Sequence, residues 1–440
     1  MIVVFMLDVR LRFFSRTTAT AIICLTCGNH LAHGAEVDVE FRLGGTYSDN
    51  VERVNSNDTS DTIASAGLWL DVSEITKRFD GSLTANIDHN VYIEDTFDDE
   101  TFASFAGVAE VQLMPRVFSW VVADSFGKLR TDPFQADIPT NREDVNRFST
   151  GPILNLRLGN VTVIQLNGLY KNTHFEISDF DTDVLSGSIS LIRMLSEARS
   201  ISLNVTADRI EYDNSDLYSN FDLQSASLAI QSRVSRGELS AAIGVNQIHD
   251  NGITSDGLLA NITWIRKISS ASSLSLGYDQ RFSESGDLFE RYQEINKSND
   301  SSMPVLGSAD PLEISKGSVG YQFDKKGNNL TVSFSHSRYD YEVDNFLDRD
   351  LSEIRFAVQR QLGAAWHARV GGRALRTEYD QSEREDDDLE ISVSIRRKFT
   401  RALGVDFMAR HIERDSNAVG SDYEENRYTV QLVYSPRARK

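Results

Sequence analysis

The chain has 440 residues, with 65 acidic and 45 basic side chains and a formal net charge of −20. This excess of carboxylates argues against a basic surface for nucleic acid. A soluble chain of this length would ordinarily divide into more than one domain, whereas a barrel grows by adding strands and needs no thicker core.

The first 34 residues have the pattern of a secretory signal peptide. Three arginines precede the short apolar stretch 17–27, and small residues near Gly34 suit a signal peptidase. We expect cleavage after Gly34, or after Ala35, so that 1–34 is the signal peptide and 35–440 the mature chain. The alternative, an N-terminal anchor helix, is disfavoured because the apolar run is shorter than the ~20 residues that span a bilayer.

Both cysteines, Cys24 and Cys27, lie in this first segment. The mature chain then contains no thiol, which excludes disulfides and cysteine-based metal or catalytic sites. Residues 1–34 also hold three Arg and one Asp, so the mature chain carries a charge of −22.

The remainder alternates apolar and polar residues over segments of about 10–15 residues. In 389–399, for example, Ile391, Val393 and Ile395 alternate with Ser392 and Ser394. This period of two is typical of a strand with two different faces. About twenty such strands are predicted, in chain order 37–47, 61–73, 79–94, 100–113, 117–130, 145–158, 161–176, 183–195, 199–212, 219–233, 237–249, 256–268, 272–285, 311–324, 328–341, 349–361, 365–380, 388–399, 403–413 and 423–434.

The connections between these segments alternate between short and long. Short ones, such as 158–160 and 324–328, contain Gly and Asn and predict tight turns. Long ones, such as 48–60, 131–144 and 286–310, are rich in Asp, Asn, Ser and Glu. We therefore predict an all-β fold, a transmembrane antiparallel up-and-down β-barrel of about 20 strands (16–22), with short turns at the periplasmic rim and long loops outside. A soluble β-sandwich array or solenoid is the rival fold, but its strands are usually shorter.

The alternation assigns the two faces of the last strands. The residues expected to face lipid are Phe356, Val358, Val370, Val393, Ile395, Val405, Phe407, Val430 and Leu432. The charged residues expected to line the lumen are Arg355, Arg369, Arg373, Glu390, Arg396, Asp406, Arg410 and Arg427. An inward position is favoured because a charged side chain facing mid-bilayer lipid costs about 2–4 kcal/mol.

Two interpretations of this arginine stripe stay open. It steers anionic solutes through a pore, with Glu390 and Asp406 as counter-charges, or it forms an Arg–carboxylate network that braces the wall. Residues 286–310, the longest connection, are the candidate plug of the lumen.

Catalytic and cofactor signals are weak. The stretch 179–183 lacks the later residues of a calcium-binding loop, and no HExxH, phosphate loop or GxSxG motif occurs. The acidic runs at 95–100 and 383–388 are better explained as solvated loops than as cation sites. We predict no cofactor, no metal and no enzymatic activity, although a Ser, His or Asp pair across strands is not excluded by sequence.

Local sequence resembles a known family. The stretch 44–73 contains Tyr47-Ser48-Asp49-Asn50-Val51 before a polar loop, and it resembles the opening of the putative β-barrel porin 2 family; Thr140-Asn141-Arg142 is similar to the same family's pattern. The resemblance extends to outer-membrane proteins of exopolysaccharide gene clusters. The chain departs from many outer-membrane barrels in continuing past Tyr434 with six further residues.

This resemblance implies a passive outer-membrane pore or an accessory channel for surface-polysaccharide export, with no catalytic residues to carry over. The alternatives are a structural or adhesive barrel with a closed lumen, and a barrel hydrolase. The expected partners are outer-membrane lipids and lipopolysaccharide, the barrel-assembly machinery and polysaccharide export components, with no nucleic acid.

Overall fold

The structure, a computed structural model, describes residues 35–250, 252–295, 308–343 and 345–436. Residues 1–34 lie outside this part of the chain, so the signal peptide and its cleavage stay predictions.

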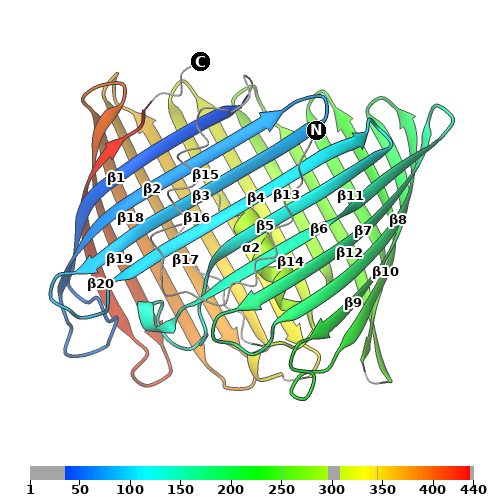
Figure 1. The fold of residues 1–440 in the computed structure, drawn as a ribbon. Helices are drawn as coiled ribbons and strands as arrows, with labels where there is room; N and C mark the ends of the chain where they lie inside the picture. Colours follow the sequence, from blue (N-terminus) through cyan, green and yellow to red (C-terminus); the bar gives the residue numbers. More distant parts are fainter. Residues whose placement is uncertain (1–34, 251, 296–307, 344, 437–440) are drawn as a thin grey trace, which may run out of the picture.

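Twenty antiparallel strands form one sheet that closes on itself, since β20 pairs with β1 (Figure 1). The predicted fold class is confirmed, and the predicted strand ends differ from the observed ones by at most three residues. The strands are β1 (Glu36–Ser48), β2 (Asp61–Ile75), β3 (Phe79–Tyr92), β4 (Glu100–Met114), β5 (Phe118–Leu129), β6 (Glu143–Leu158), β7 (Thr162–Phe175), β8 (Thr182–Ser196), β9 (Arg199–Tyr212), β10 (Phe221–Val234), β11 (Gly237–Asp250), β12 (Ile253–Lys267), β13 (Ser272–Ser283), β14 (Leu312–Lys325), β15 (Asn328–Tyr341), β16 (Arg349–Gln361), β17 (Trp366–Tyr379), β18 (Glu385–Lys398), β19 (Leu403–Ser416) and β20 (Tyr423–Tyr434).

Short and long connections lie at opposite rims, as Figure 1 shows. One connection departs from the alternation. Only residues 251 and 252 separate β11 from β12, at the rim that otherwise carries the long loops.

The outer face of the barrel is apolar, which suits contact with lipid. Val405 is part-exposed, and the other eight residues predicted to face lipid are exposed: Phe356, Val358, Val370, Val393, Ile395, Phe407, Val430 and Leu432. No helix among the described residues is long and apolar enough to cross a bilayer.

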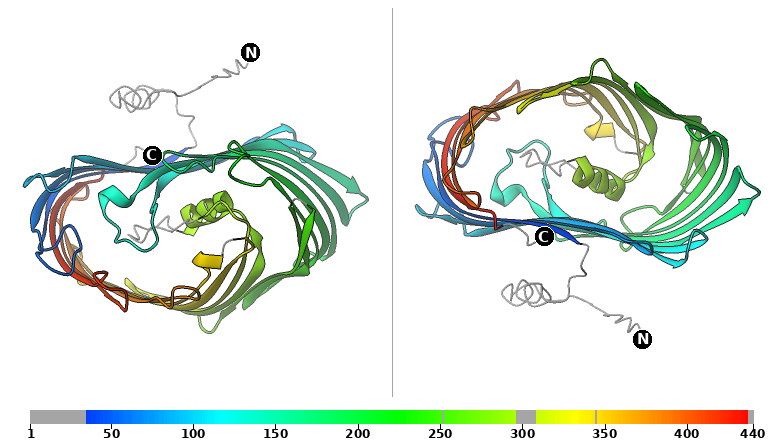
Figure 2. Two further views of the ribbon diagram at one scale, coloured as in Figure 1. Left: turned by 90° about the horizontal axis from the view of Figure 1, so that it is seen from below. Right: turned by 90° about the horizontal axis from the view of Figure 1, so that it is seen from above.

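Three segments lie inside the ring of strands, where both views of Figure 2 show them. They are helix α2 (Ser285–Ile295), the segment 130–142 with the short helix η2 (Pro139–Asn141), and the short helix η3 (Asn345–Leu347). The predicted strand 272–285 is two residues too long, because β13 ends at Ser283. Helix α2 occupies the start of the predicted long connection 286–310.

Candidate functional site

The eight predicted lumen residues lie on one face of β16 to β20. Directly opposed residues of an antiparallel pair share a face. The register sets Arg355 opposite Arg373, Arg373 opposite Glu390, Arg396 opposite Asp406, and Arg410 opposite Arg427, while Arg369 alternates in phase with Arg373. This face is the inner one, because Glu425 shares it with Arg427 and is bound by Arg53, whose guanidinium also donates to Asp137 of the internal segment.

Carboxylates neutralise most of these arginines. Arg396 contacts Asp406 at 2.5 Å and Arg410 contacts Glu390 at 3.2 Å, so the two named counter-charges do pair with the stripe. Three further acids were not anticipated: Glu353 contacts both Arg355 and Arg373, Glu425 contacts Arg427, and Glu40 contacts Arg396. Within the described ranges Arg369 makes no ion pair, and it is exposed. The pairing is the arrangement that the bracing interpretation expects.

Helix α2 begins where the chain leaves the wall. The Glu284 carboxylate accepts hydrogen bonds from the backbone N–H groups of Gly286 (2.6 Å) and Asp287 (2.9 Å), which satisfies two donors at the start of the helix. Burial raises the pKa of Glu284 above its ordinary value, although the nearby Arg147 guanidinium acts in the opposite direction.

A single arginine of the wall binds this helix. Arg147 of β6 is buried, and its guanidinium contacts Glu284 at 2.8 Å, Asp287 at 2.5 Å and Glu290 at 3.1 Å. It also donates to Thr173 Oγ1 at 2.6 Å. We call Arg147 and its three carboxylates the latch. Removing one partner of a buried ion pair costs about 3–5 kcal/mol, because the other charge stays buried and uncompensated.

Gly286 allows this close approach. A Cβ atom at Gly286 would lie 1.8 Å from Nη1 of Arg147 and 2.4 Å from Oγ1 of Thr173. Any side chain there would push the start of α2 away from β6 and β7.

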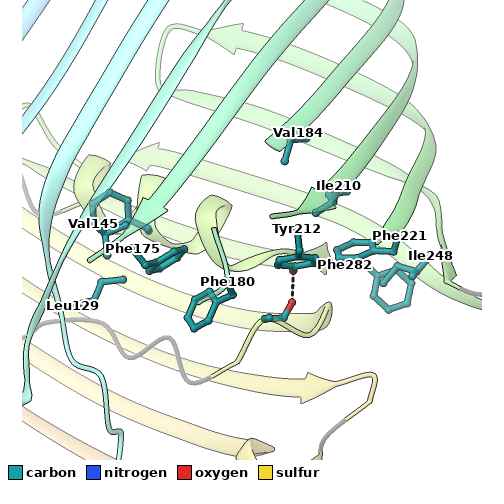
Figure 3. Close-up of a cluster of buried hydrophobic side chains, with 12 residues drawn as sticks. Leu129, Val145, Phe175, Phe180, Val184, Ile210, Tyr212, Phe221, Ile248 and Phe282 are labelled. Carbon is teal, nitrogen blue, oxygen red and sulfur yellow. Dashed lines mark hydrogen bonds between the residues drawn. The ribbon is translucent and has the colours of Figure 1, made fainter. Parts of the chain in front are cut away.

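Apolar side chains pack around the same helix (Figure 3). Phe289 of α2 is fully buried at the centre of the cluster. Tyr212 closes one side, and its hydroxyl donates to the carbonyl of Ala309. The other members come from the long-loop ends of β5 to β11, from the 176–181 loop and from β13: Leu129, Val145, Phe175, Phe180, Val184, Ile210, Phe221, Ile248 and Phe282. The latch and this cluster together fix α2 against the wall on one side of the lumen.

The segment 130–142 is folded by one side chain. Asn141 is buried, and its amide accepts from Thr131 and from the backbone of Asp132, and donates to the carbonyls of Asp132 and Ala136, all within 2.8–3.0 Å. Asn141 belongs to the Thr140-Asn141-Arg142 pattern noted in the sequence. Asn141 in this pattern therefore has a structural role, which is to hold the fold of 130–142.

Arginines join this segment to the rest of the barrel. Arg142 contacts Asp137 at 2.8 Å and Glu100 at 3.1 Å, and Arg384 donates to the carbonyl of Phe134 at 2.9 Å. Burial alone would raise the pKa of Asp137, but Arg142 and other nearby arginines hold it below its ordinary value. Asp137 is therefore ionised at neutral pH.

Sequence reasoning missed the latch and the fold of 130–142. The signal that could have found the latch is Arg147 itself. It lies in the inward phase of β6, opposite Ser125 and Thr173, so neither neighbouring strand offers it a carboxylate directly across the sheet. Among the described residues no group of three or more His, Cys, Asp or Glu side chains is arranged to hold a metal ion.

The last six strands match a known protein family. Residues 326–435 match the model of the family described as Putative beta-barrel porin 2. The resemblance noted in the sequence is confirmed by this match, which covers β15 to β20 and the arginine stripe. The residues that suggested it, 44–73 and 140–142, lie outside the matched range, and the association with exopolysaccharide clusters stays a prediction.

The chain is also similar in fold to solved structures of a receptor and a transporter. The siderophore receptor PirA from Acinetobacter baumannii is 10% identical over 92% of this chain and 81% of its own, with a TM-score of 0.47. The FrpB iron transporter from Neisseria meningitidis is 10% identical over 91% of this chain and 83% of its own, with a TM-score of 0.45. A comparison with curated proteins gives no match. The closed barrel, its apolar exterior and the porin family match make the chain an outer-membrane β-barrel.

Proposed function

We propose that this barrel is a passive outer-membrane pore whose lumen is kept shut by α2, and that it serves as an accessory channel for surface polysaccharide. The observation that carries the proposal is the position of α2, inside a closed barrel and bound to its wall through a buried arginine. A helix that only braced the barrel would not need an ion-pair network with a buried arginine, because apolar contacts alone cost less to bury.

The inner wall supports passage of hydrophilic solutes. Paired charges keep the wall polar and wetted, and lumen charge sets the preference of a pore for ions. Arg369 is the member of the stripe with no carboxylate within contact distance among the described residues. We expect it to contribute most to anion preference.

Reversal potentials in planar bilayers test the steering of anions. Neutralising Arg369, Arg373, Arg396 and Arg410 with glutamine should move the selectivity of the current away from anions, because their carboxylate partners would be left in excess. The matched control replaces Arg209 and Arg376, arginines of the outer surface, and should leave the reversal potential unchanged. If the quadruple variant and the wild type carry the same cation-selective current, steering of anions by the arginine stripe is ruled out.

The two alternatives make different predictions. A structural or adhesive barrel gives no conductance under any condition, including after the latch is broken. A hydrolase loses activity on lipid or glycan when a single Ser, His or Asp is replaced without loss of folding. Export is tested by the amount of secreted polysaccharide in a host strain that lacks the chain and is complemented with wild-type or Arg147→Ala protein.

A further inference from the structure

The barrel wall has a break in its hydrogen bonding between β12 and β13. These strands pair only from Ala260 opposite Gln280 to Lys267 opposite Ser273. Beyond that point β12 continues to Ile253, still paired with β11, and β13 continues to Ser283, still paired with β14. We call this unpaired stretch the seam. Exposed backbone edges are costly in contact with lipid, and the described strands leave a second one between β4 and β5, beyond Phe105 opposite Phe126.

At the seam the end of β13 lies on the lumen side of β12. Phe282 is in phase with Tyr278 and Gln280, and Tyr278 is 39% exposed on the outer surface, so alternation predicts that Phe282 faces lipid. Instead Phe282 is 4% exposed and belongs to the apolar cluster around α2. A Cβ atom at Gly257 of β12 would lie 2.8 Å from the Phe282 ring. The glycine therefore leaves room for the ring on the inner face of β12.

One side chain satisfies a backbone donor that the seam leaves without a strand partner. Asn246 of β11 is buried opposite Gly257, and its amide NH₂ is 2.9 Å from the Gly257 carbonyl while its amide oxygen is 2.6 Å from the Phe282 N–H. In a continued ladder the Phe282 N–H would face Leu258, whereas the backbone of Gly257 already pairs with Asn246 on β11. The seam is thus held by a side chain that can be displaced rather than by a ladder.

The register already defines a second arrangement. Continuing the observed pairing of β12 and β13 by three residues sets Leu259 opposite Arg281, Leu258 opposite Phe282, and Gly257 opposite Ser283. In that arrangement Phe282 would lie beside Leu258, which is 44% exposed on the outer surface. The Phe282 ring would leave the apolar cluster around α2 and contact lipid instead. The backbone of the seam would gain its missing hydrogen bonds.

We propose that the seam is the switch of the plug: closing the β12–β13 ladder brings Phe282 and Ser283 beside β12 and moves the start of α2 away from Arg147. Glu284, the first partner of the latch, follows Ser283 directly, so a shift of Ser283 toward β12 also moves the carboxylate that Arg147 binds. This inference rests on the proposed pore only where conductance is measured.

Two cysteine pairs distinguish the arrangements, since residues 35–440 contain no cysteine. Leu258→Cys with Phe282→Cys forms a disulfide only in the closed ladder, because in the present arrangement the two side chains lie on opposite sides of β12. Val245→Cys with Leu258→Cys, an outward-facing pair already opposed on β11 and β12, is the matched control. We expect the first pair to oxidise slowly in wild-type background and several-fold faster when Arg147→Ala is added.

Hydrogen exchange of the α2 peptide reports on the plug independently of any current. In the oxidised 258–282 variant, exchange of α2 should accelerate about tenfold and return on reduction. Failure of this pair to oxidise even with Arg147→Ala, while the control pair forms, would overturn the inference. Oxidation without faster exchange of α2 would overturn it too. Faster exchange without any conductance would keep the switch and refute the pore.

Discussion

At the scale of single residues, the position of α2 depends on Arg147 and on the carboxyl that begins the helix. Glu284 contacts Arg147 in the latch and also accepts two backbone hydrogen bonds, so its protonation state is linked to whether α2 stays on the wall. Arg147, Asp287 and Lys171 are the charged groups that most affect it.

The raised pKa of Glu284 predicts the direction of a pH effect. The latched form binds the proton more tightly than a released form in which the carboxyl is in water. Lowering the pH through the range above the ordinary value of 4.5 should therefore favour the latched form and reduce conductance. Conductance measured from pH 8 to pH 5 checks the sign. Glu284→Gln should abolish the dependence, whereas Glu290→Gln, at the exposed contact of the same arginine, should retain it.

At the scale of elements, the segment 130–142 is fixed by hydrogen bonds rather than by a core. Asn141→Ala removes four hydrogen bonds and leaves buried backbone groups unpaired, at about 1–3 kcal/mol for each group that finds no water. Hydrogen exchange in 130–142 should rise about tenfold while the strands keep their protection. The adjacent exposed residue supplies the control, and Thr140→Ala should change neither. Equal exchange in both variants would show that the arginine contacts alone hold the segment.

The strands could be predicted from sequence because each is marked by its own alternation of apolar and polar residues, with a period of two. The ends of β9, β15, β16 and β20 agree with prediction residue for residue. Helix α2 could not be predicted, because its eleven residues begin with Ser285 and Gly286 and its apolar contacts come from many strands, β5 to β11 and β13. The inward position of Phe282 is equally hidden from the alternation of β13, because it depends on Asn246 of β11 and Gly257 of β12.

At the scale of the whole molecule, the barrel has an apolar exterior, a charged and paired inner wall on β16 to β20, and a helix bound inside it. The sequence predicts the arginines as lumen residues and Glu390 and Asp406 as their counter-charges, but not the contact of Arg396 with Glu40, because that ion pair joins opposite ends of the chain. The proposed function depends on α2 being a plug that the latch holds against the wall.

Single-channel recording of wild type and Arg147→Ala in planar bilayers tests that claim most directly. Wild type should be closed for most of the recording, and Arg147→Ala should show long, stable openings, because the three carboxylates of the latch lose their partner. Arg209→Ala, which removes an exposed arginine of the outer surface, should behave as wild type. Open probabilities that are equal in Arg147→Ala and wild type, or no openings in either, would contradict the account.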